Sequence, residues 1–242
     1  MNGELIVAQV YVDDIIFRST KNELAHNFSK LMQAKFEMSM IGELNHFLGL
    51  QIRQQESGIF ISQSKYAKNL MKKFGLKYAS PIKTPMSPNI KLTVDLLGKS
   101  VDSSLYRSMI GNLLYLTASR PDISYSVGVC VRYQPNPKKS NIIALKRIIK
   151  YVKATTDFGV WYSKNTNDVL AGYSDANWAG NADDRKSTSG GCFYVGNNLI
   201  SWMNKNQNSI SYPLLRLNTS LSVAVPPNFC GCKKLLLDYG IR

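Results

Sequence analysis

Residues 5–17 read Leu-Ile-Val-Ala-Gln-Val-Tyr-Val-Asp-Asp-Ile-Ile-Phe, two apolar runs that meet at the adjacent carboxylates Asp13 and Asp14. Apolar runs on both sides of a short polar turn predict a β-hairpin. Two neighbouring carboxylates repel each other in a partly buried site, and a divalent cation removes this cost. Mg²⁺ suits carboxylate and phosphate oxygens together. An Asp-Asp turn is also ordinary hairpin chemistry, so residues 11–14 alone leave both interpretations open.

The elements after this hairpin are expected to be a helix and a second hairpin. Apolar residues fall near one face of residues 22–36, which predicts a helix. Residues 44–52 have a strand pattern, and a turn at 56–58 leads to a second strand at 59–62.

Residues 63–75 predict a basic amphipathic helix. Tyr66, Leu70 and Phe74 recur on one face, and another face carries lysines at Lys65, Lys68 and Lys72. Residues 80–88 contain three prolines, which exclude a helix and indicate a linker or an extended arm.

Residues 103–155 predict three helices, the first at about 104–118, the second opened by Pro121, and the third at about 138–154. The third helix has an apolar face and a different face with four lysines, Lys139, Lys146, Lys150 and Lys153. A lysine face is either a solvated helix surface or a strip that neutralises phosphates and releases counterions. The sequence leaves both readings open.

Residues 158–202 change to a strand pattern. The segments 169–175, 190–195 and 198–202 predict a three-stranded antiparallel meander. Together with the preceding hairpins and helices, this predicts a mixed α+β fold.

The charge of the chain favours a polyanionic partner. Lys and Arg number 30 against 16 Asp and Glu, which gives a formal net charge of +14. The sequence has no apolar run of about 18 residues, so a transmembrane segment is not expected. The first residues lack the basic region of a signal peptide, so a signal peptide is not expected either. An intracellular protein, in the cytoplasm or nucleus, is therefore expected. Four cysteines without a CxxC pair and only two histidines do not predict a zinc site, and in an intracellular chain the cysteines are expected to be free thiols.

Several segments, in this order, resemble the polymerase polyprotein (Pol) of copia-type LTR retrotransposons over residues 5–211. They include Tyr-Val-Asp-Asp-Ile-Ile at 11–16, Phe-Leu-Gly-Leu-Gln-Ile at 47–52 and Tyr-Arg-Ser-Met-Ile-Gly-Asn-Leu-Leu-Tyr-Leu at 106–116. They continue with Ser-Arg-Pro-Asp-Ile at 119–123, Gly-Tyr-Ser-Asp-Ala-Asn-Trp-Ala-Gly at 172–180 and Asp-Arg-Lys-Ser-Thr-Ser-Gly at 184–190.

The resemblance implies a reverse transcriptase followed by an RNase H region. Asp13 and Asp14 would be polymerase ligands for Mg²⁺ or Mn²⁺, with two metals clamping the attacking and leaving oxygens. The primer-grip hairpin would include Phe47, Leu48 and Gly49, and the basic helices would be the thumb and connection. The implied partners are an RNA or DNA template–primer duplex and the rest of the Pol polyprotein. Asp175 would be the first RNase H metal carboxylate.

The sequence departs from the family at both expected active sites. The family polymerase has another metal-binding aspartate on an earlier strand, whereas Glu4 is the single acid before Tyr11. The third RNase H carboxylate of the family would lie beyond Arg242. Asp183 and Asp184 lie beside Arg185 and Lys186, and we expect them to be solvated loop residues. Full metal sites are therefore not expected.

Residues 212–232 have the pattern of an out-of-frame translation. The family peptide Ser-Thr-Ala-Glu-Ala-Glu-Tyr-Ile, with the alanine codon after it, can be encoded so that reading one base later gives Pro-Leu-Leu-Arg-Leu-Asn-Thr-Ser-Leu. This is the sequence of residues 213–221. Family-like sequence returns at Lys233. We hypothesise two compensating frameshifts, which would make Cys230 and Cys232 accidental. One-base insertions or deletions in the coding DNA, compared with intact relatives, test this hypothesis.

These observations predict three parts: a palm remnant at 1–62, a helical thumb and connection at 63–157, and an RNase H-like fragment at 158–242. The predicted function is that of a retrotransposon reverse transcriptase and RNase H fragment that is catalytically inactive alone. The alternative is a non-enzymatic nucleic-acid-binding remnant or a pseudogene product.

Overall fold

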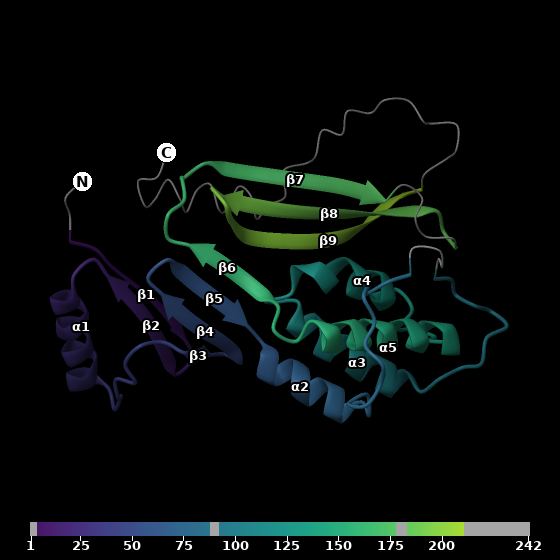
Figure 1. The fold of residues 1–242 in the computed structure, drawn as a ribbon, viewed down its shortest axis with the longest axis horizontal. Coiled ribbons are helices and arrows are strands. Elements are labelled where there is room, and N and C mark those ends of the chain that lie inside the picture. Colours follow the sequence, from purple (N-terminus) through teal and green to yellow (C-terminus); the bar gives the residue numbers. More distant parts are fainter. Residues whose placement is uncertain (1–3, 88–91, 178–182, 211–242) are drawn as a thin grey trace. The chain divides into compact units, whose positions relative to one another are not determined.

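A computed structural model describes residues 4–87, 92–177 and 183–210 (Figure 1). Within these ranges the fold is mixed α+β, with helices and small antiparallel sheets, as predicted. The chain divides into two compact units, Met1–Phe47 and Leu48–Arg242.

The first unit contains the predicted hairpin and helix. Strands β1 (Ile6–Tyr11) and β2 (Asp14–Ser19) pair antiparallel, with Tyr11 opposite Asp14. Helix α1 (Asn22–Lys35) packs on β2 through Phe28, whose ring centroid lies 5.0 Å from that of Phe17. The short strand β3 (His46–Phe47) ends the unit.

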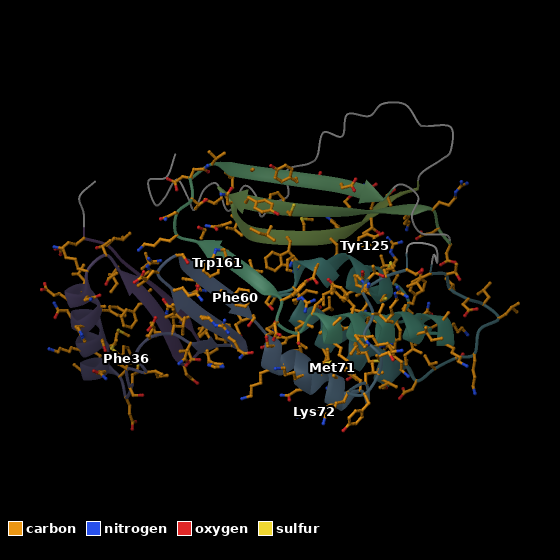
Figure 2. The ribbon with its side chains drawn as sticks, in the orientation of Figure 1. Phe36, Phe60, Met71, Lys72, Tyr125 and Trp161 are labelled. Atoms are coloured by element: carbon orange, nitrogen blue, oxygen red, sulfur yellow. The ribbon has the colours of Figure 1, made fainter. Side chains whose placement is uncertain are left out.

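The second unit begins with a hairpin that a distant strand extends. Strands β4 (Leu50–Gln55) and β5 (Gly58–Ser62) pair across the predicted turn, and β6 (Gly159–Ser163) pairs with the other edge of β5. Figure 2 labels Phe60 and Trp161, which face each other across β5 and β6. The pairing joins residues from the predicted first and third parts of the chain, whose division by function remains a prediction.

The continuous strand predicted at 44–52 is wrong. The backbone leaves the extended conformation at Leu48 and Gly49, whose φ angles are +48° and +78°. Strand geometry requires negative φ, so a turn at these residues separates β3 from β4.

Four helices form the core of the second unit, with the boundaries that apolar spacing predicts to within a few residues. They are α2 (Ser64–Lys73), α3 (Ser103–Leu116), α4 (Pro121–Val131) and α5 (Lys139–Ala154). The Asp102 side chain accepts a hydrogen bond from the Ser104 amide at 2.8 Å and so caps α3, while Pro121 opens α4. One apolar cluster joins all four helices, including Leu70, Leu113, Val127, Leu145 and Ile149.

The predicted meander is present as β7 (Leu170–Asn177), β8 (Lys186–Val195) and β9 (Asn198–Ile210). Strand β9 lies on the helices, where the Trp202 indole donates to the Thr117 carbonyl at 2.9 Å. The Asn204 amide donates to the Ser124 carbonyl at 2.8 Å. Two side chains thus dock the meander on the core.

Other predictions concern cysteines, membrane spans and the shifted segment. Cys130 and Cys192 are free thiols, as predicted, and burial raises the pKa of Cys130 to about 12. In the described ranges no helix is long and apolar enough to cross a membrane. Residues 212–232, with Cys230 and Cys232, lie outside the described residues.

Candidate nucleic-acid interface

The acidic hairpin of the first unit presents both carboxylates to solvent. Asp13 lies in the turn and Asp14 is the first residue of β2. The turn places Val12 at φ +52°, a conformation that costs free energy for a β-branched side chain. The Tyr11 ring meets the Phe47 ring edge-on at 6.3 Å. The tip is therefore a strained, exposed turn with two adjacent oxygen donors.

The oxygen donors of this hairpin fit a hard divalent cation in type, but they are few. Mg²⁺ prefers oxygen ligands in octahedral geometry. Among the described residues, no group of three or more His, Cys, Asp or Glu side chains could hold a metal ion. Asp13 and Asp14 can thus supply part of a coordination sphere.

The other predicted acids lie in the second unit. Asp175 is exposed on β7 and pairs in register with Gly190 of β8. Asp183 and Asp184 are exposed, as predicted, but both make local contacts. Asp183 accepts a hydrogen bond from the Val94 amide at 2.9 Å, and Asp184 lies 3.7 Å from the Lys186 ammonium. Asp183 and Asp184 therefore make local contacts in their loop regions.

The lysines of α2 form an exposed row on a fixed helix. Lys65, Lys68 and Lys72 are all exposed, whereas Ala67, Leu70 and Met71 are buried in the core. In Figure 2, Lys72 points away from the helical core while the neighbouring Met71 lies against it. The Lys65 amide also donates to the Gln51 side chain at 2.8 Å, which fixes the start of the helix against β4.

The lysines of α5 do not form one uniform face. Lys139 and Lys146 are exposed, whereas Lys150 and Lys153 are half-buried. The Lys153 ammonium donates to the Ala79 carbonyl at 2.8 Å, and the Arg147 guanidinium donates to the Thr84 hydroxyl at 2.8 Å. The proline-containing segment that follows α2 therefore lies along the last turns of α5. The structure thus separates Lys139 and Lys146 from the other two lysines.

The turn at Leu48 and Gly49 is held by a residue that the sequence did not single out. The Tyr115 hydroxyl, on α3, donates to the Leu48 carbonyl at 2.5 Å. Tyr115 belongs to the motif at 106–116, between the exposed Leu114 and the buried Leu116, and this position in the sequence gives no sign of the contact. Phe47 belongs to the first unit, so the three predicted grip residues are divided between the two units.

A second unexpected feature is a partly buried network around the buried Arg120, between the first and second predicted helices. The Arg120 guanidinium binds Asp122 through two hydrogen bonds of 2.9 and 2.7 Å and donates to the Thr155 carbonyl at 2.8 Å. The Tyr151 hydroxyl donates to the same carboxylate at 2.8 Å. The network joins the start of α4 to the end of α5. The sequence hint for this network was an arginine and an aspartate on either side of the proline that opens α4.

This network also sets the ionisation of Asp122. Burial by itself raises the pKa of the carboxyl, but the hydrogen bonds and charge of Arg120, together with Tyr151, outweigh burial. The pKa of Asp122 is therefore held below its usual range.

Comparisons with known proteins agree with the resemblance. Residues 1–88 match the family described as Reverse transcriptase (RNA-dependent DNA polymerase). The "uncharacterized mitochondrial protein AtMg00810" of Arabidopsis thaliana is 36% identical over 84% of this chain and 84% of its own length. The retrovirus-related Pol polyprotein from transposon RE1 of the same plant is 35% identical over 85% of this chain. That from transposon TNT 1-94 of Nicotiana tabacum is 28% identical over 99%. No solved structure matches.

The chain belongs to the reverse transcriptase family of copia-type retrotransposon Pol polyproteins. It corresponds to 14% of the length of the RE1 polyprotein and 19% of the TNT 1-94 polyprotein. Reverse transcriptases act on nucleic acid and generally use divalent metal ions.

Proposed function

We propose that this chain binds a template–primer duplex of RNA or DNA through its helical part, as the thumb and connection of a reverse transcriptase. The observation that carries this proposal is the exposed lysine row Lys65, Lys68 and Lys72 on a helix whose opposite face is buried. Lys139 and Lys146 supply further positive charge on α5.

The physics of such a surface favours backbone contacts over base recognition. Lysine ammonium groups neutralise phosphates and release counterions, which makes affinity fall steeply with salt. Phosphate contacts position a protein on a duplex without reading its sequence. Binding by this chain is therefore sequence-indifferent, and its strength depends on ionic strength.

The test is duplex binding measured by fluorescence anisotropy across ionic strength. Substituting the three α2 lysines together (Lys65→Gln, Lys68→Gln, Lys72→Gln) lowers the magnitude of the slope of log affinity against log salt by about 3. The charge-matched control substitutes three exposed lysines of other elements (Lys30→Gln, Lys35→Gln, Lys164→Gln) and leaves the slope near the wild-type value. Equal slope changes in the two variants would contradict this interface.

The metal-binding part of the proposal concerns Asp13 and Asp14. These carboxylates would hold Mg²⁺ or Mn²⁺, with Asp13 as the more direct ligand, and the ion would supply charge for phosphoryl transfer. The chain's own residues present the carboxylates on a strained turn at the hairpin tip. Two acids do not organise two metal ions, so this chain alone is inactive as a polymerase. Primer extension with Mg²⁺ or Mn²⁺ tests this, and incorporation that Asp13→Asn abolishes would overturn it.

The remaining assignments are part of the same proposal. Asp175, on the first strand of the meander, is the candidate first carboxylate of an RNase H-like region. Nucleic acid as partner implies an intracellular place of action, in the cytoplasm or nucleus. In relatives the rest of the Pol polyprotein would supply the partner domains.

A further inference from the structure

The turn between β3 and β4 has an unusual backbone. Leu48 and Gly49 are consecutive and both lie at positive φ, at +48° and +78°. For residues other than glycine a positive φ costs conformational free energy, so the surroundings must hold Leu48 in this conformation. The turn itself is exposed, and burial of its side chains does not explain the conformation.

The Tyr115 side chain is the contact that holds this turn. Its hydroxyl donates to the Leu48 carbonyl at 2.5 Å. A Cβ atom added at Gly49 would lie 2.0 Å from the same hydroxyl oxygen and 3.2 Å from the ring carbon that bears it. Tyr115 therefore both fixes the carbonyl of the turn and excludes a side chain at Gly49.

Tyr115 is in turn supported by buried polar groups and an aromatic neighbour. Its ring meets the Tyr66 ring edge-on at 4.7 Å, and the Tyr66 hydroxyl donates to the Asn112 side chain at 3.0 Å. The buried Gln63 amide donates to the Tyr115 carbonyl at 3.3 Å and accepts from the Ser119 hydroxyl at 2.8 Å. Residues at the start of α2, in α3 and in the connection between α3 and α4 thus converge on one tyrosine.

We propose that Tyr115 is a positioning residue, which sets the backbone of the Leu48–Gly49 turn so that the β4–β5 hairpin and helix α3 present one continuous surface to the primer strand. The assignment rests on the proposed function, because the turn matters for nucleic acid only if the hairpin contacts a primer. Tyr115 is 42% exposed, so part of this residue is accessible to a bound strand.

The first test is hydrogen exchange of the full chain carrying Tyr115→Phe. The phenylalanine keeps the ring contact with Tyr66 and removes the bond to Leu48. Exchange of the amides at 48–52 accelerates by about three- to tenfold, while exchange in α3 and α5 stays at the wild-type rate. The control is Tyr78→Phe, which removes the hydroxyl of an exposed tyrosine outside this cluster and leaves exchange at the turn unchanged. Unchanged exchange at 48–52 in Tyr115→Phe, or equal acceleration throughout the core, would overturn the proposal.

A double-mutant cycle with Gly49→Ala tests the geometry directly. In the wild-type background the alanine Cβ meets the tyrosine hydroxyl, whereas in the Tyr115→Phe background this atom is gone. The positive φ of residue 49 is common to both backgrounds. Gly49→Ala therefore lowers the folding equilibrium constant in both backgrounds. The factor by which it does so is smaller, by about threefold or more, in the Tyr115→Phe background. Additive effects of the two substitutions would contradict the contact.

Binding to two duplexes separates this proposal from the proposed function. Wild type prefers a template–primer with a recessed 3′ end over a blunt duplex, and Tyr115→Phe reduces this preference while keeping the same salt slope. If the wild-type chain binds neither duplex, both the proposed function and the primer contact are overturned. The exchange pattern would still decide whether Tyr115 sets the turn. A recessed-end preference that Tyr115→Phe leaves intact would overturn the primer contact alone.

Discussion

The hairpin of the first unit and the four helices of the second differ in how they are built. Val10 and Val12 beside the two acids are 67% and 80% exposed, whereas Leu113, Leu145 and Ile149 of the helices are fully buried. The acidic motif that identifies the family thus lies in a thinly packed hairpin, and the residues that stabilise the fold lie elsewhere. Substitutions of the two acids are therefore expected to leave the stability of the helical core unchanged.

The largest effect is expected from a cavity in the helical core. Leu113→Ala removes a fully buried side chain and lowers the free energy of unfolding by about 2–5 kcal/mol. Val10→Ala, on the exposed hairpin, changes it by about 0.5 kcal/mol or less. Urea unfolding followed by circular dichroism measures both. Similar losses for the two variants would break the contrast between the regions.

A smaller effect is expected at the buried arginine. Arg120 is 2% exposed, and lysine cannot reproduce its two-pronged contact with Asp122. Arg120→Lys lowers the free energy of unfolding by about 2–3 kcal/mol, because charge-assisted hydrogen bonds are lost in a buried site. The comparison is Lys186→Gln, which removes an exposed ion pair with Asp184 and costs about 1 kcal/mol or less. Equal losses in the two variants, measured by urea unfolding, would show that burial of the Arg120 guanidinium does not strengthen its contact with Asp122.

The smallest effect concerns acid. Because the pKa of Asp122 is lower in the folded chain than its usual value, the ionised carboxylate stabilises the fold at neutral pH. This stabilisation is complete above the unfolded value of about 4 and is lost as pH falls through the folded value. Urea midpoints measured from pH 6 to pH 3 should fall less steeply in Asp122→Asn than in wild type. Parallel pH profiles of the two proteins would show that Asp122 does not contribute to the acid sensitivity of the fold.

Much of this fold follows from local sequence pattern. The acidic hairpin, the helix after it and the four core helices lie where apolar spacing predicts them. For the four core helices the reason is that each buries one face against its neighbours. Pro121 opens α4, as expected from its fixed φ angle. The exposed α2 lysines follow from the same spacing.

The errors and omissions all come from contacts between distant residues. Residues 44–52 look like one strand, and the break at Leu48 accompanies a hydrogen bond from Tyr115, 67 positions away. Lys153 resembles the other α5 lysines, but a carbonyl from the segment after α2 engages its ammonium. The Arg120 network likewise needs α5 in place before its partners are recognisable. Periodicity reports which face is buried and carries no information about which distant residue covers it.

The pairing of β5 with β6 has a consequence for synthesis of the chain. One edge of β5 is completed by a strand that the ribosome makes about 100 residues later, roughly 5–20 s at ordinary translation rates. During this interval the nascent hairpin presents unpaired backbone groups, while the intervening helices can already form from local contacts. Closing this sheet therefore comes after the helices can form, and until then a neighbouring chain could compete for the open edge of β5.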